Sequence, residues 1–191
     1  MLIIRSYDPR DWPAVQDVHD AARLIELTLS VDAHAFRSLS EIYVDEQLFD
    51  STVWMAELEG RVVGFVAVNE DELTWLYVHP ASHRTGVGRR LLEHALAAID
   101  GEATAWVLAG NEPALRLYKS AGFRVVETKA GHLSGSPDIP ATGYCLRRAN
   151  GRSAGCPELT ARQTPSPTDR STSACAAAGS PAAITVDRNV M

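Results

Sequence analysis

A glycine- and arginine-rich segment in the middle of the chain has the residue types that bind an anion. Residues 83–90 read His-Arg-Thr-Gly-Val-Gly-Arg-Arg, between an apolar, aromatic run at 73–78 and an amphipathic helical pattern at 87–99. A helix start leaves about four backbone N–H groups without intrahelical partners and carries roughly half a unit of positive charge. Gly86 and Gly88 lack Cβ atoms, so a phosphate could approach this backbone closely. Three arginines add positive charge: Arg84, Arg89 and Arg90. A plain tight turn between strand and helix is the alternative.

Two common nucleotide-binding motifs do not fit this segment. A P-loop ends in Gly-Lys-Ser/Thr, whereas two arginines follow Gly88, and no hydroxyl is present there to bind magnesium. A dinucleotide fingerprint needs a third small residue, where this chain has Leu91, and usually lies in the first βαβ unit. The segment therefore matches neither of these two classes of nucleotide-binding loop.

The segment resembles the acyl-CoA pyrophosphate loop of the GNAT superfamily of N-acetyltransferases. That loop reads Gln/Arg-x-x-Gly-x-Gly/Ala after a strand ending Val-x-Pro, and residues 78–80 and 83–88 match it, with His83 in place of the usual Gln or Arg. Residues 111–123 match the second family motif, Asn-x-x-Ala-x-x-x-Tyr-x-x-x-Gly-Phe. Two independent motifs in the right order argue against chance, and the family pattern covers roughly residues 1–149.

The resemblance implies a binding site for acetyl-CoA as co-substrate, without a metal. In the family, two central strands splay apart after a bulge, and acyl-CoA pairs with the exposed strand edge like an extra strand. The strand backbone holds the pantetheine arm and the thioester carbonyl, and the loop amides bind the pyrophosphate. The cofactor-binding residues that this implies are Leu76, Tyr77, Val78, Arg84, Thr85, Gly86, Val87, Gly88, Arg89 and Asn111.

Acetyl transfer to an amine needs a polarised carbonyl, a deprotonated amine and a proton for the departing thiolate. The second motif identifies Tyr118 as the general acid, although spacing alone would favour a core tyrosine. Some family members carry a general-base Glu in the strand before this motif, but residues 104–108 contain no carboxylate. We take Glu72 as the first choice for the base, acting directly or through water, with Glu70 or Asp71 behind it; each also fits a polar turn.

Length, charge and cysteine content limit the class of protein. The chain has 191 residues and a net charge of −6, which argues against general binding to nucleic acid or membrane surfaces. No N-terminal apolar segment is long enough for export or membrane spanning, so a cytoplasmic location is expected. The spacing of the three cysteines indicates neither a disulfide framework nor a zinc site: Cys145, Cys156 and Cys175.

The order of the elements predicts one α/β (α+β) domain at residues 1–149, with a mixed, mostly antiparallel twisted sheet flanked by helices. Strands are expected at 2–5, 52–57, 61–68, 72–78, 103–108, 123–127 and 144–147, helices at 12–25, 35–49, 87–99 and 112–121, and a loop at 131–142. Residues 150–191 contain no aromatic residue and much Ser, Thr, Ala, Gly and Pro, so we predict a disordered tail that catalysis does not need.

The first 50 residues carry ten acidic side chains against four arginines, a local charge of −6. A solvated helix face would explain this charge. Alternatively, the helices of this region border the acceptor site in the resembled family, and a negative field there would concentrate a cationic amine.

Together these features predict an N-acetyltransferase that moves an acetyl group from acetyl-CoA to a primary amine by direct attack in a ternary complex. The acceptor is a small cationic amine or amino-sugar, or a protein N-terminus or lysine. A non-catalytic acyl-CoA-binding sensor is the alternative, because the family's usual Glu is missing. Homodimers are common in the family, although no feature of this sequence requires one.

Overall fold

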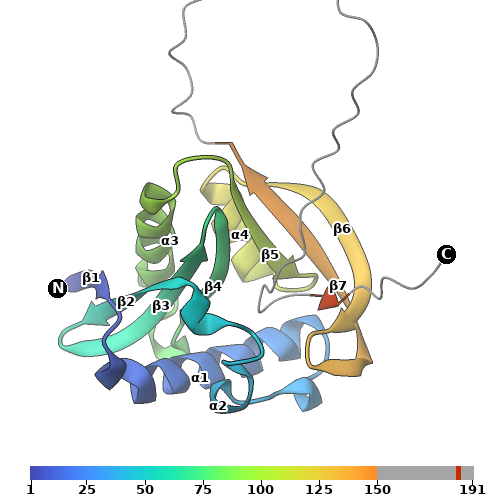
Figure 1. Ribbon diagram of the computed structural model, residues 1–191, viewed down its shortest axis with the longest axis horizontal. Coiled ribbons are helices and arrows are strands. Elements are labelled where there is room, and N and C mark those ends of the chain that lie inside the picture. Colours follow the sequence, from blue (N-terminus) through green and yellow to red (C-terminus); the bar gives the residue numbers. More distant parts are fainter. Residues whose placement is uncertain (150–183, 186–191) are drawn as a thin grey trace, which may run out of the picture.

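The computed structural model describes residues 1–149 and 184–185 and contains one eight-stranded sheet (Figure 1). The strands lie in the order β1-β2-β3-β4-β5-β7-β6-β8, and all neighbours are antiparallel except β4 and β5. Their bounds are β1 Leu2–Ser6, β2 Thr52–Leu58, β3 Arg61–Asn69, β4 Glu72–Val78, β5 Ala103–Leu108, β6 Arg124–Leu133, β7 Ser136–Arg148 and β8 Ile184–Thr185. The predicted mixed, mostly antiparallel sheet is confirmed.

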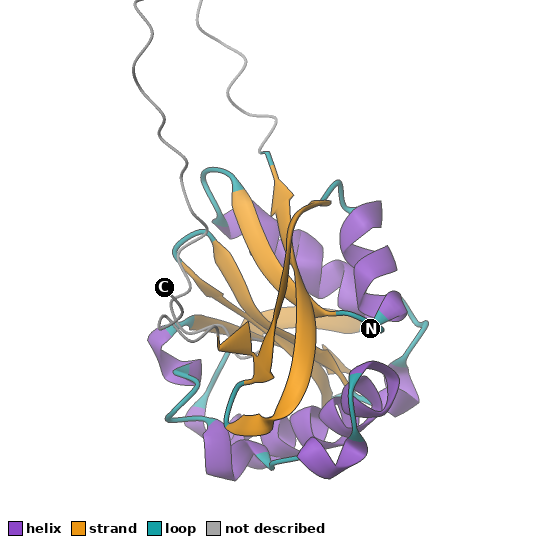
Figure 2. Ribbon diagram, turned by 90° about the vertical axis from the view of Figure 1, so that its right-hand side faces the viewer, coloured by secondary structure: helices purple, strands orange, loops and turns teal. Residues whose placement is uncertain are grey.

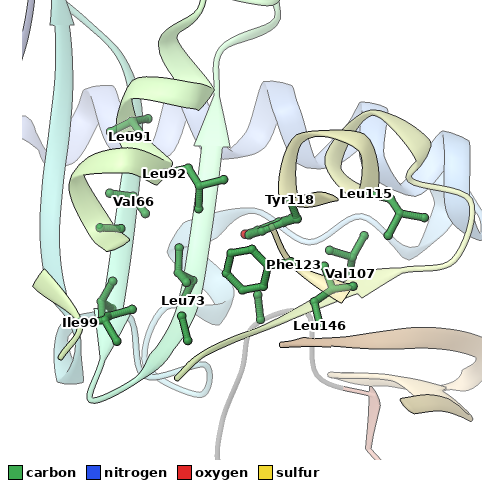
Figure 3. Close-up of a cluster of buried hydrophobic side chains, with 14 of the residues drawn as sticks. Val66, Leu73, Leu91, Leu92, Ile99, Val107, Leu115, Tyr118, Phe123 and Leu146 are labelled. Carbon is green, nitrogen blue, oxygen red and sulfur yellow. The ribbon is translucent and has the colours of Figure 1, made fainter. Parts of the chain in front are cut away.

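Helices cover both faces of this sheet, as the two views show (Figures 1 and 2). The α-helices are α1 Trp12–Ser30, α2 Leu39–Ile42, α3 Val87–Ala98 and α4 Glu112–Ser120. The short 3-10 helices are η1 Pro9–Asp11, η2 Ala33–Ala35, η3 Leu48–Asp50 and η4 Pro80–Ser82. One buried cluster joins α3 and α4 to the sheet (Figure 3), and a second joins α1 and α2 to the other face. A sheet with apolar side chains on both of its faces needs helices packed against each face.

The two residues between β2 and β3 have the backbone of a tight hairpin turn. Glu59 and Gly60 both have positive φ, 53° and 79°, which is the conformation of a type I′ turn. Such a turn matches the natural twist of the paired strands, and the ladder begins directly beside it with Leu58 paired to Arg61.

The predicted long helix at 35–49 is wrong, because the chain there breaks into short pieces. Only α2 is α-helical, between η2 and η3. A capping box of Ser38 and Glu41 opens α2, and the backbone N–H of Leu39 donates to the Asp20 carboxylate of α1 at 2.8 Å. Gln47 then takes a left-handed φ of 53°, which ends the helical path. Apolar spacing predicted one helix where local capping and a contact with α1 give several turns.

The predicted loop at 131–142 is also wrong, because β6 and β7 extend through it as a long hairpin. His132 pairs with Pro140 and Leu133 with Ser136, so residues 137–139 form a bulge on β7. Pro137 lies in this bulge, where it removes no ladder hydrogen bond. The Gly, Ser and Pro residues that indicated a loop serve the bulge and the turn at Gly135, whose φ is +70°.

Most of the predicted disordered tail, residues 150–183 and 186–191, lies outside the described residues. Within the tail, Ile184 and Thr185 pair with Leu133 and His132 of β6. None of the helices in the described part of the chain is long and apolar enough to cross a membrane.

A buried carboxyl group lies between α2 and η3. Glu46 is only 7% exposed, and burial raises the pKa of this carboxyl group from 4.5 to about 7, although Arg23, Ser134 and Arg37 partly oppose the shift. The acidic first third is therefore not simply a solvated face.

The Glu46→Gln variant should lose a pH dependence that the wild type shows. Between pH 4.5 and about 7, folded Glu46 keeps a proton that the unfolded chain has lost, so the free energy of unfolding of the wild type falls as pH rises. We expect Glu46→Gln to gain up to about 3 kcal/mol relative to wild type between pH 5 and pH 8. Urea denaturation at both pH values measures this, with the exposed Asp50→Asn as control. An equal difference from wild type at the two pH values would contradict it.

Candidate active site

The strands β4 and β5 separate soon after they meet. They form ladder pairs only between Glu72 and Thr104 and between Leu73 and Ala105, and β5 then continues along β7. On the other side of β4, Val68 pairs with Leu73 and Ala67 with Trp75, so Thr74 is an extra residue in a bulge. The second half of β4 therefore presents an edge whose backbone groups have no ladder partner on β5 within the described residues.

A cleft of about 660 Å³ opens along this edge. Its walls come from α1, β4, the loop before α3, β5 and α4, which Figure 1 shows around the centre of the sheet. Its lining includes most of the residues predicted from the sequence to bind the cofactor, namely Leu76, Tyr77, Val78, Arg84, Gly86, Gly88, Arg89 and Asn111. The predicted acid Tyr118 also lines it.

The loop between β4 and α3 points backbone donors at one end of the cleft. Gly86 is the N-cap of α3 with a φ of 89°, and the first intrahelical bond runs from Arg90 N–H to Gly86 C=O at 3.1 Å. The N–H groups of residues 87–89 thus have no intrahelical acceptor. The first turn of α3 holds no acidic residue, so nothing in it competes with an anion.

Two side chains hold this loop in shape. The ring Nε2 of His83 lies 2.8 Å from the carbonyl oxygen of Val78, and the Thr85 hydroxyl donates to the carbonyl of Ser82 at 2.7 Å. His83, the departure from the family pattern, thus ties the loop back to the end of β4. Thr85 and Val87 do not line the cleft, and Val87 is 1% exposed in the core beneath it.

Helix α4 brings Tyr118 to the opposite wall. Asn111 caps this helix, because its side-chain Oδ1 accepts from the Ala114 N–H at 3.2 Å. The Tyr118 ring packs edge-on against Phe123 and points from α4 toward the strand that carries Leu73 (Figure 3). Its hydroxyl has no hydrogen-bond partner among the described residues, and burial, then Glu26 and Glu72, raise its pKa well above 10. The phenol is therefore protonated throughout the neutral range.

The structure adds a carboxylate that the sequence analysis did not single out. Glu26 of α1 lies in the cleft, and its side chain is 12% exposed. It accepts hydrogen bonds from Arg23, Tyr77 and Asn111. Two of these donors are 51 and 85 residues away along the chain, so no local pattern could reveal the contact.

The predicted base Glu72 lies elsewhere. It begins β4, where that strand still pairs with β5, and it is not among the residues lining the cleft. Its carboxylate is close enough to raise the pKa of Tyr118, although less than burial and Glu26 do. Glu70 and Asp71 lie in the β3–β4 turn, outside the lining.

These features fit an extended acyl-CoA molecule. An unpaired strand edge can hydrogen-bond an amide-containing arm, and the amides at the start of α3 can bind a pyrophosphate. Both lie along the same cleft as the Tyr118 hydroxyl. Among the described residues, no group of three His, Cys, Asp or Glu side chains is arranged as a metal site.

Comparison with known proteins agrees with this geometry. The family model of the acetyltransferase (GNAT) domain matches residues 49–125. The chain is 33% identical over 104 residues to the peptidyl-lysine N-acetyltransferase YjaB of Escherichia coli, which covers 54% of this chain and 70% of that protein. It is 30% identical over 131 residues to the ribosomal protein bS18-alanine N-acetyltransferase of Escherichia coli, with 64% and 81% covered.

The fold also matches solved structures. The PaiA N-acetyltransferase of Thermoplasma acidophilum, crystallised with coenzyme A, has a TM-score of 0.61 at 17% identity, over 78% of this chain and 99% of that one. This likeness shows the fold, and the sequence relatives show the family. The chain therefore belongs to the GNAT family and is an acyl-CoA-dependent acetyltransferase.

Proposed function

We propose that this enzyme transfers an acetyl group from acetyl-CoA to an aliphatic primary amine by direct attack in a ternary complex. The observation that carries the proposal is the separation of β4 from β5, which leaves a strand edge in one cleft with the α3 amides and the Tyr118 hydroxyl. Bound there, acetyl-CoA supplies the thioester as acetyl donor.

The residues divide this work between them. The backbone at Leu76, Tyr77 and Val78 binds the pantetheine arm and holds the thioester carbonyl. The loop from Arg84 to Arg89 binds the pyrophosphate through backbone N–H groups that have no intrahelical acceptor. Tyr118 donates its proton to the sulfur when the carbon–sulfur bond breaks.

The acceptor enters from the side of α1. There Ile25 and Leu29 are 39% and 49% exposed and line the same cleft as Glu26. An acidic group with aliphatic side chains in the same cleft suits an ammonium on an aliphatic carbon. A protein lysine or an N-terminal alanine would fit, and the relatives named above act on such groups.

The sensor alternative predicted from the missing strand carboxylate is not favoured. Glu26 places a carboxylate in the cleft from another element, and the named relatives are enzymes. The cytoplasmic location, the lack of nucleic-acid and membrane partners, and a homodimer stay predictions.

Acetyl transfer measured on the full chain tests this function. The probes are a peptide with a free N-terminal alanine, a lysine peptide with a blocked N-terminus, and spermidine as a small cationic amine. We expect coenzyme A release and an acetylated product, detected by mass spectrometry, with at least one probe. Binding of acetyl-CoA without product from any of the three would contradict the proposed reaction.

A further inference from the structure

Glu26 is the one acidic side chain among the described residues that line the cleft. It projects from the C-terminal part of α1, whereas the loop proposed to bind the pyrophosphate follows the end of β4 and carries Arg84 and Arg89. The cleft therefore has a cationic end and a separate acidic wall. Such a division suits one anionic and one cationic substrate.

Three donors fix this carboxylate from three parts of the fold. Oε2 accepts from Arg23 Nη1 at 2.6 Å and from the Tyr77 hydroxyl at 3.0 Å. Oε1 accepts from Asn111 Nδ2 at 3.2 Å. The orientation of the Asn111 amide is set independently, because its Oδ1 accepts from the Ala114 N–H. The contacts thus join α1 to β4 and to the start of α4, across the gap between the separated strands.

This bonding leaves room for one more donor. A carboxylate offers about four acceptor positions, and the described residues occupy two on Oε2 and one on Oε1. Arg23 neutralises part of the Glu26 charge, but it contacts Oε2 alone, so it does not occupy Oε1. Oε1 accepts from Asn111, and both Glu26 and Asn111 line the cleft.

We propose that Glu26, rather than Glu72, binds the acceptor ammonium and takes its proton before the amine attacks. This assignment rests on the proposed function. Once neutral, the nitrogen forms a bond to the acetyl carbon, the carbon–sulfur bond breaks, and its electron pair leaves on the sulfur. The nitrogen loses two protons in total. The first passes from Glu26 to solvent. The second reaches solvent as the amide forms, and solvent supplies one proton to Tyr118 after the phenol has protonated the sulfur. Atoms and charge then balance with one proton released.

The roles of Glu26 and Glu72 can be distinguished by experiment, because Glu72 lies at the start of β4 and Glu26 lies in the cleft. Glu72 lies where β4 and β5 are still paired, so a substrate in the cleft meets Glu26 first. Both raise the pKa of Tyr118, but Glu26 has the larger effect. An amide in place of each carboxylate keeps the shape and removes the charge, so Glu26→Gln and Glu72→Gln form a matched pair.

The test uses the full chain with whichever probe peptide the wild type acetylates. For Glu26→Gln we expect kcat/KM for the peptide to fall at least about 100-fold, as the loss of a general base does. The fall in kcat/KM of Glu72→Gln should be smaller than that of Glu26→Gln by a factor of at least about ten. Asp17→Asn, which removes an exposed carboxylate of the same helix outside the cleft, should stay near wild type. Calorimetric titration of the peptide into protein saturated with coenzyme A adds a readout without turnover, and we expect clearly weaker binding by Glu26→Gln alone.

A merely structural role of Glu26 predicts different results. The base role predicts an affinity for acetyl-CoA near wild type in Glu26→Gln and partial recovery of the activity of Glu26→Ala with added formate, whereas a structural role predicts neither. Both roles predict a lower melting temperature, because Glu26→Gln leaves the buried Arg23 guanidinium without its carboxylate partner. Peptide turnover by Glu26→Gln within about threefold of wild type, or a larger loss in Glu72→Gln, would overturn the assignment while leaving the transferase function intact. A wild type that acetylates no probe would instead overturn the function on which the assignment rests.

Discussion

Tyr118→Phe is expected to lower kcat by about 100- to 1000-fold, the usual contribution of a positioned general acid. The phenol is buried, its hydroxyl has no hydrogen-bond partner among the described residues, and its raised pKa keeps the proton in place at neutral pH. Removing the hydroxyl leaves the departing thiolate without a nearby proton. Steady-state release of coenzyme A with a saturating acceptor measures the effect.

The packing of the ring should survive this change. Phe keeps the edge-on contact with Phe123, so the affinity for acetyl-CoA and the melting temperature should match wild type. Tyr43→Phe provides the control, because Tyr43 packs on Trp12 and Phe49 outside the cleft. A kcat for Tyr118→Phe within about threefold of wild type would show that the proton comes from elsewhere.

Gly88→Asp should weaken acetyl-CoA binding about 100-fold while leaving the domain folded. Gly88 is the second residue of α3, and a Cβ there would meet Leu117 and Val78 at 3.4 and 3.6 Å, which is ordinary contact. An acidic residue in the first helical turn is favourable for the helix itself. Against a bound pyrophosphate, the same carboxylate would cost about 3 kcal/mol at a separation of about 5 Å, so we expect the dissociation constant to rise about 100-fold.

The neutral isostere isolates this charge effect. Gly88→Asn has nearly the same shape as Gly88→Asp, so the difference between their dissociation constants reports repulsion rather than size. Gly86 is less suitable for this test, since its φ of 89° would strain any side chain. Equal affinities of the Asp and Asn variants for acetyl-CoA would place the pyrophosphate away from this helix.

The loop and the second motif could be located from the sequence because their chemistry is local. Gly86 and Gly88 lie at a strand-to-helix turn, and Asn111 caps the helix that carries Tyr118 seven residues later. Each position follows from short-range backbone rules, so spacing alone carried the information. The structure brings these residues to one cleft, as the family resemblance implied.

Glu26 could not be identified in this way, because its position depends on contacts between distant segments. In the sequence it is one of ten acidic residues in a region that resembles a solvated helix face. Its burial depends on Tyr77 and Asn111, which the separation of β4 from β5 places on either side of it. The spacing of Arg23 and Glu26, one helical turn apart beside the apolar face of α1, was the one local signal.

The broken helix after α1 and the long β6–β7 hairpin have the same cause. The apolar spacing at 35–49 could not show that the Asp20 carboxylate accepts from the Leu39 N–H at the start of α2. The glycines and prolines at 131–142 could not show that a bulge lets β7 continue through this segment. In both segments, tertiary pairing overrides local propensity.

Calorimetric titration of the full-length wild type with acetyl-CoA decides whether the cleft beside β4 is a cofactor site. We expect saturable binding of one molecule per chain, with a micromolar dissociation constant, by protein whose circular dichroism shows the folded α/β domain. Folded protein that releases no heat and shows no shift in melting temperature with acetyl-CoA would contradict the cofactor site, and with it the assigned reaction.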